Sequence, residues 1–191
     1  MAPRRFFVPV AAALIALAAA LIERAPAQSQ LPEEVDTALV ISVDVSNSVD
    51  EHRYHLQMEG IAKALEDSEV VEAILNGPQG GIAISMLTWA DRPRIAIPWT
   101  RIKSKEDAAA VAARVRALPR QTGEFTCVST MLRNVAHKVV TQIPFKAYRV
   151  VVDVSGDGAD NCNATEPVKA VRDELVDGGV TINGLPILEG G

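Results

Sequence analysis

Two apolar runs, each leading to an aspartate in a polar loop, constrain the fold of this chain more than any other feature. Residues 38–43 are all apolar or β-branched but one, and they end at Asp44. Residues 150–154 form a similar run, interrupted only by Asp153, before a Ser-Gly-Asp-Gly loop at residues 155–158. Near-continuous apolar runs are typical of strands buried on both faces, as in parallel sheets. The two runs therefore predict central strands of a mainly parallel sheet.

The rest of the chain alternates between strand and helix patterns. Strands are predicted at residues 38–43, 82–89, 94–99, 148–154 and 180–185, and helices after Asp50, at Ser104, from residue 128 and from Thr165. The short link at residues 90–93 favours a hairpin between the second and third strands. This order predicts a three-layer α/β sandwich of Rossmann-like type, with a mainly parallel central sheet and one antiparallel edge strand.

The N-terminus has the pattern of an export signal. Arg4 and Arg5 precede an uncharged apolar run at residues 6–22, and Ala25-Pro26-Ala27 offers a cleavage site. The alternative is an uncleaved membrane anchor, for which a run of 17 residues is at the short limit. The predicted organisation is a signal peptide at residues 1–27, a linker at 28–35 and one domain at 36–191.

The charge of the predicted mature chain argues against one class of partner. The full chain has 19 basic and 24 acidic residues, and removing residues 1–27 leaves 16 and 23, a net charge of −7. Nucleic-acid binding requires a basic surface, so we expect no nucleic-acid partner. After cleavage no second apolar run is long enough to span a bilayer. We expect an exported protein, either periplasmic or extracellular.

Three polar loops are expected to meet at one edge of the sheet. Asp44, Ser46 and Ser48 follow the first run, Asp157 follows the second, and Thr126 precedes a predicted helix. Ligands of α/β sheets bind at the carboxyl ends of the strands, so these oxygens can converge. Carboxylates and hydroxyls select hard cations such as Mg²⁺, Mn²⁺ or Ca²⁺. The same residue types also suit helix capping and turns, which is the alternative interpretation.

The order and spacing of these residues resemble a known metal site. Asp44-x-Ser46-x-Ser48, the later Thr126 and the later Asp157-Gly158 resemble the metal-ion-dependent adhesion site of von Willebrand A domains. The resemblance covers roughly residues 36–188 and is closest to a group of exported bacterial proteins of uncharacterised function. It implies that Ser46, Ser48 and Thr126 bind the ion directly, and that Asp44 and Asp157 bind it directly or through waters.

The resemblance also implies a function. A partner Asp or Glu would complete the coordination of Mg²⁺, or of Mn²⁺ or Ca²⁺, so we expect a protein-binding module with an acidic partner and no catalysis. The alternative is a metal-dependent hydrolase or phosphatase outside the cytoplasm. Against it, Ser46 stands where a haloacid-dehalogenase-like phosphatase needs a second aspartate, and neither a G-x-S-x-G motif nor a phosphate-binding loop is present.

Two departures from the family pattern concern a loop and the chain end. Glu124 and Phe125 stand where related domains often carry glycines before the threonine, so the conformation of that loop is left open. The chain stops at Gly191, so we expect the domain to lack the last helix and strand of the family.

The chain has two cysteines, Cys127 and Cys162, which in an exported protein favour a disulfide over two free thiols. Cys127 follows Thr126, and Cys162 lies five residues beyond Asp157, so a bridge would tie two of the metal loops together. The intervening Asp160 and Asn161 are interpreted as turn residues.

Overall fold

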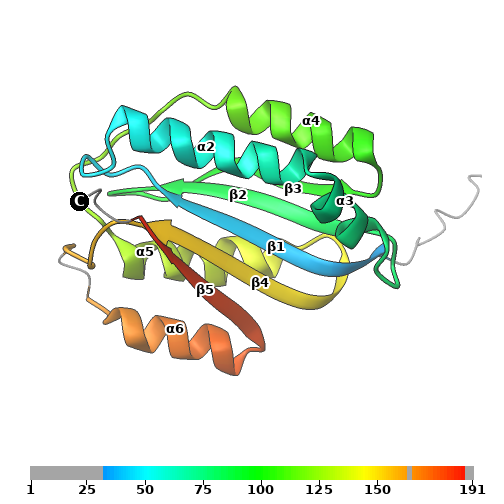
Figure 1. The fold of residues 1–191 in the computed structure, drawn as a ribbon. Helices are drawn as coiled ribbons and strands as arrows, with labels where there is room; N and C mark the ends of the chain where they lie inside the picture. The colour runs from blue at the N-terminus through cyan, green and yellow to red at the C-terminus, as the bar shows by residue number, and fades with distance from the viewer. Residues whose placement is uncertain (1–31, 163–164, 188–191) are drawn as a thin grey trace, which may run out of the picture. The chain divides into compact units, whose positions relative to one another are not determined.

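The computed structural model describes residues 32–162 and 165–187, which form a five-stranded sheet with helices on both faces (Figure 1). The predicted export signal, residues 1–27, lies outside the described residues. The strands are β1 (Glu34–Asp44), β2 (Ile82–Trp89), β3 (Arg94–Ile102), β4 (Lys146–Gly156) and β5 (Val180–Pro186), in the spatial order β3-β2-β1-β4-β5. Only β3 is antiparallel to its neighbour, at one edge of the sheet. The predicted fold class is therefore confirmed.

The central position of β1 explains its apolar sequence. The strand pairs in parallel with β2 on one side and β4 on the other. Connections between parallel strands place helices on the faces of the sheet, so both faces of β1 are covered. Val40 and Val43 are fully buried as a result. At the carboxyl end, Val43 pairs with Ser155 of β4 and Asp44 pairs with Trp89 of β2. The polar loops after β1 and β4 therefore start side by side.

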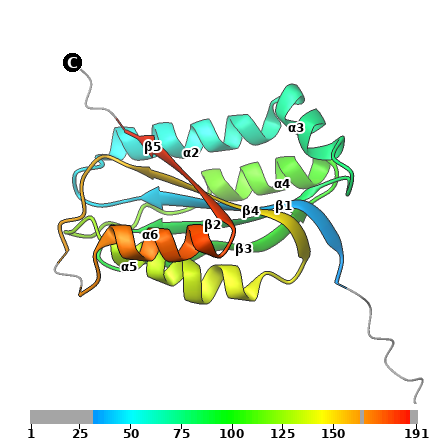
Figure 2. The same cartoon turned by 90° about the horizontal axis from the view of Figure 1, so that it is seen from below.

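The helices form two layers. α2 (Glu51–Glu66) and α4 (Lys105–Arg116) cover one face of the sheet, and α5 (Val128–Asn134) and α6 (Val168–Asp177) cover the other (Figures 1 and 2). The predicted starts of two helices are confirmed. Asp50 caps α2 by accepting the Arg53 N–H at 2.8 Å, and Ser104 caps α4 by accepting the Asp107 N–H at 3.1 Å. Each layer encloses its own apolar core against the sheet. Among the residues that the structure describes, no helix combines the length and the hydrophobicity that a membrane span requires.

The largest differences between the structure and the predicted elements concern two helices. The chain forms an unpredicted helix, α3 (Ser68–Leu75), directly after α2; its start depends on Asp67, whose Oδ1 accepts the N–H groups of Glu69 and Val70. In addition, the helix predicted from residue 128 becomes a π-helical segment at Val135–Val139 and then a 3₁₀ turn. An apolar stripe has nearly the same spacing in these helix types over one turn, so the sequence pattern does not separate them.

Candidate metal centre

Asp44 occupies the end of β1 as a fully buried carboxylate. Its Oδ1 accepts the Ser46 N–H at 2.8 Å, but its Oδ2 has no hydrogen-bond partner among the described residues. Burial raises the pKa of Asp44, and the hydrogen bond from Ser46 opposes that rise. A buried carboxylate oxygen without a partner is costly, and a cation, a proton or a bound water would compensate it.

Side-chain oxygens from three loops lie in a hydrogen-bonded row beside this carboxylate. Thr126 Oγ1 donates to Ser46 Oγ at 3.4 Å, and Ser46 Oγ lies 3.0 Å from Ser48 Oγ. Ser48 Oγ in turn donates to Asp157 Oδ1 at 2.8 Å. These atoms, called the oxygen row below, come from the loops after β1 and β4 and from the loop before α5. The structure therefore brings together all five residues predicted from the sequence: Asp44, Ser46, Ser48, Thr126 and Asp157.

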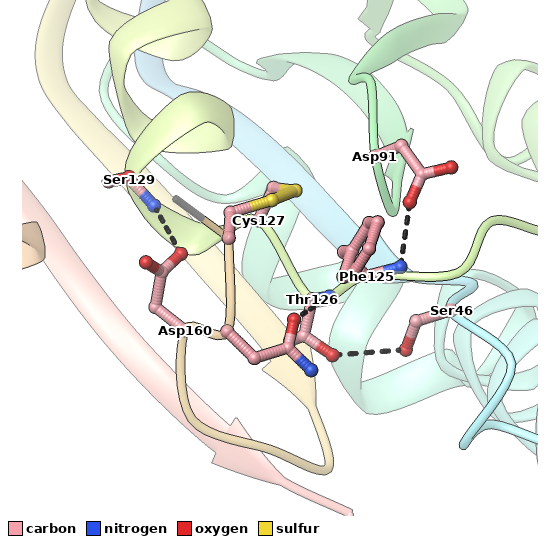
Figure 3. Close-up of a disulfide and its surroundings, with 9 residues drawn as sticks. Ser46, Asp91, Phe125, Thr126, Cys127, Ser129 and Asp160 are labelled. Carbon is pink, nitrogen blue, oxygen red and sulfur yellow. Dashed lines mark hydrogen bonds between the residues drawn. A yellow bond between two sulfur atoms is a disulfide. The ribbon is translucent and has the colours of Figure 1, made fainter. Parts of the chain in front are cut away.

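The loop that carries Thr126 is fixed to the loop that carries Asp157. Cys127 and Cys162 form the predicted disulfide, with their Cα atoms 5.1 Å apart (Figure 3). Asn161 Oδ1 accepts the Thr126 N–H at 2.7 Å, and the Asn161 N–H donates back to the Thr126 carbonyl at 3.1 Å. The interpretation of Asn161 as a turn residue thus missed a contact across 35 positions of sequence, for which the chain carries no local signal.

The same loop is held from its other side by the links after β1 and β2. The Asn47 N–H donates to the Gly123 carbonyl at 2.9 Å. Asp91 Oδ1 accepts the Phe125 N–H at 2.6 Å (Figure 3), another contact that the sequence did not indicate. Among the described residues no non-glycine residue has a positive φ, so Phe125 fits this loop without the conformational freedom of glycine. Phe125 remains 44% exposed.

Arg53 on α2 places a positive charge next to the oxygen row. One guanidinium nitrogen lies 3.6 Å from Asp157 Oδ2 and donates to the Ser48 carbonyl at 3.4 Å. The Asp157 side chain is only 4% exposed, so solvent and salt screen its interaction with the Arg53 guanidinium poorly. No sequence pattern singles out Arg53, which lies in the first turn of an ordinary amphipathic helix.

Replacing Arg53 with glutamine is expected to tighten the binding of Mg²⁺ about five- to tenfold. The substitution removes the guanidinium charge, which competes with the ion for Asp157. The interaction energy of one such charge at this distance is on the order of 1 kcal/mol. Titration calorimetry of the variant and the parent at equal ionic strength measures the change. Arg114→Gln, which removes the same charge from α4, should leave the affinity unaltered. Weaker binding by Arg53→Gln would mean that Arg53 positions Asp157 and does not compete with the ion.

Histidines do not contribute to this centre. His52 and His55 are exposed on α2, and His55 lies 3.8 Å from Glu51 in its own helix. Within residues 32–162 and 165–187, no three His, Cys, Asp or Glu side chains cluster in a way that could hold a metal. A cation in the candidate centre would therefore take its protein ligands largely from hydroxyl groups.

The fold has counterparts among solved structures. Proximal thread matrix protein 1 from the mussel byssus superposes with a TM-score of 0.62 at 18% identity, over 84% of this chain and 38% of that one. A second structure of that protein, with a zinc-occupied MIDAS motif, gives 0.61 at 21% identity over 82% and 39%. A von Willebrand factor type A protein from Catenulispora acidiphila gives 0.57 at 14% identity over 78% and 33%. The chain thus has a von Willebrand A-like fold and spans less than half the length of these proteins.

The family of the chain follows from its sequence. Residues 34–191 match the family described as "Protein of unknown function (DUF1194)", and the chain belongs to that family. A search of curated proteins found no match.

Proposed function

We propose that this protein is an exported binding module that captures an acidic group of a partner protein through a divalent cation. The cation would be held by the residues of the three loops: Asp44, Ser46, Ser48, Thr126 and Asp157. The observation that carries the proposal is the buried Asp44 Oδ2, which has no hydrogen-bond partner in the part of the chain that the structure describes and lies next to a row of hydroxyl and carboxylate oxygens. The disulfide supports export, because such bonds persist in oxidising compartments.

The spacing of the oxygen row suits a small hard cation. Adjacent oxygens around an octahedral Mg²⁺ with bonds of about 2.0–2.1 Å lie about 2.9 Å apart. The Ser46–Ser48 and Ser48–Asp157 contacts, at 3.0 and 2.8 Å, are close to that spacing. The hydroxyls can therefore exchange hydrogen bonds for metal bonds with little movement. We propose Mg²⁺ as the ion, with Mn²⁺ or Ca²⁺ as alternatives that the same oxygen ligands also suit.

The composition of the site explains why it would bind a partner. Three of its five side chains are neutral hydroxyls. The protein therefore supplies no more than two carboxylates to balance the charge of the ion. A bound cation supplies an exchangeable water position that an outside carboxylate can take. Burial of Asp44, Ser46 and Thr126 keeps those groups preorganised, whereas Ser48 is exposed and marks the open side. The zinc-occupied MIDAS motif of the mussel protein supports metal binding by this arrangement on the same fold.

A peptide pair tests the function. Two short peptides that differ only in a central aspartate or asparagine are titrated into the protein and followed by NMR. The aspartate peptide should bind in Mg²⁺ and lose at least about tenfold in affinity in EDTA, because its carboxylate no longer has a cation to complete. The asparagine peptide should not bind. Equal binding of both peptides, or binding unaffected by EDTA, would contradict the proposal.

Enzyme assays separate this proposal from its alternative. The protein is tested for Mg²⁺-dependent hydrolysis of p-nitrophenyl phosphate and p-nitrophenyl acetate. We expect no turnover above that of the Asp44→Ala variant. Turnover that the substitution abolishes would instead favour a metal-dependent hydrolase or phosphatase at the same site.

A further inference from the structure

A hollow of about 610 Å³ opens directly beside the candidate metal centre. Its walls are the link between β2 and β3 and the loop before Thr126. It is called the rim pocket here and is defined by Val45, Asp91, Arg92, Arg94, Gly123 and Phe125. Val45 stands between Asp44 and Ser46, and Phe125 precedes Thr126, so the rim pocket and the metal centre share two loops.

The charge of the rim pocket differs from that of the whole chain. The chain has a net charge of −5, yet the pocket contains two exposed arginines, Arg92 and Arg94, against the single carboxylate of Asp91. Neither arginine forms an ion pair with any residue in the described part of the chain. Arg116 and Arg133, in contrast, are each paired with two glutamates. The positive charge of the rim pocket is therefore free to act on an outside anion.

The walls of the rim pocket are held in place. A Cβ atom on Gly123 would lie 2.6 Å from Ala90 Cβ and 2.9 Å from Asp91 Oδ2, so the two loops touch through this glycine. Asp91 Oδ1 also accepts the Phe125 N–H, so one oxygen of the Asp91 carboxylate is used to join the two walls. A pocket that is formed before binding loses less entropy when a ligand enters it.

We propose that the rim pocket binds a second acidic side chain of the same partner, so that the protein recognises a segment with two nearby carboxylates. One carboxylate would complete the cation, and the other would bind the guanidinium groups of Arg92 and Arg94, which suit bidentate contact with carboxylates. The exposed Phe125 lines the same pocket as the two arginines and directly precedes Thr126, so it offers an apolar surface to the stem of the second side chain. This inference depends on the proposed function and specifies its partner class.

The test compares peptides with one and with two acidic residues. Each peptide of the first series carries a fixed aspartate and one glutamate, which is placed at one of the next four positions. Each peptide of the matched series carries glutamine in place of that glutamate. In Mg²⁺, at least one doubly acidic peptide should bind the parent protein about tenfold more tightly than its glutamine counterpart. In Arg92→Ala/Arg94→Ala that preference should vanish, while the affinity for Mg²⁺ and for the singly acidic peptides stays within about twofold. Arg149→Ala/Arg172→Ala, away from this rim, removes equal charge and should keep the preference.

The outcomes separate the two proposals. If the singly acidic peptide binds in a Mg²⁺-dependent way but no second acid improves binding, the rim pocket inference is wrong and the proposed function stands. The same holds if the preference survives in Arg92→Ala/Arg94→Ala. If the parent protein shows no Mg²⁺-dependent binding to any peptide of either series, the proposed function fails and the inference fails with it.

Discussion

Replacing Asp44 with alanine is expected to weaken the binding of Mg²⁺ by about 100-fold or more. The carboxylate is fully buried at the end of β1, and none of the described residues donates a hydrogen bond to its Oδ2. In this buried environment the attraction between the carboxylate and a nearby cation is far stronger than in water. Its Oδ1 also fixes the backbone of Ser46 through the 2.8 Å hydrogen bond. The substitution therefore removes charge and loosens a hydroxyl ligand at once. Titration calorimetry measures the affinity directly.

The controls for this result use the same strand. Asp44→Asn keeps an acceptor for the Ser46 N–H but removes the negative charge, so it should lose most of the affinity and keep the fold. Asp36→Asn changes an aspartate near the opposite end of β1, where both oxygens accept the Gln79 N–H at 3.1 Å, and should leave Mg²⁺ binding unaltered. An Asp44→Ala protein with parental affinity would place the ion elsewhere.

Removing the disulfide by Cys127→Ser/Cys162→Ser is expected to lower the free energy of unfolding by about 3.5–4 kcal/mol. The cysteines are 35 positions apart, and the chain-entropy model assigns a closed loop of this length that stabilisation. The bridge also joins the loops of Thr126 and Asp157, so the metal centre loses preorganisation as well as stability. We expect Mg²⁺ affinity to fall about tenfold, less than in Asp44→Ala. Urea unfolding with and without Mg²⁺ gives both quantities.

A second variant separates the two effects of the disulfide. Asn161→Ala removes the acceptor of the Thr126 N–H but leaves the covalent bridge intact. It should weaken Mg²⁺ binding while costing less stability than the loss of the bridge. If the double serine variant binds Mg²⁺ as tightly as the parent, the covalent link does not position the metal loops.

The fold could be predicted from the sequence because its signals are local and agree with one another. The apolar runs before Asp44 and Asp157 indicated buried strands, and residues 90–93 indicated a hairpin. The predicted ends of two strands were too short, because β1 and β4 extend beyond their apolar runs by pairing with each other. The helix α3 was missed because its start depends on one aspartate among charged neighbours, Asp67, with neither glycine nor proline before it.

The candidate site could be predicted only in part. Its five side chains follow predicted strands or precede a predicted helix, so their meeting at one rim follows from sheet topology. The residues that hold those loops together are not accessible to such reasoning. Asp91, Arg53 and Asn161 act through contacts 34, 104 and 35 positions away in the chain. These contacts depend on how the loops pack, and no periodic pattern or short motif encodes them.

We propose that loops from three parts of the chain hold a hard divalent cation with one side open to a partner. Anomalous diffraction at the manganese edge, from crystals grown with Mn²⁺, tests it most directly. We expect one strong peak within about 2.3 Å of both Ser46 Oγ and Ser48 Oγ, with a water or a neighbouring carboxylate on its open side. A protein that shows no peak at these hydroxyls under saturating Mn²⁺, or only peaks elsewhere, would contradict it.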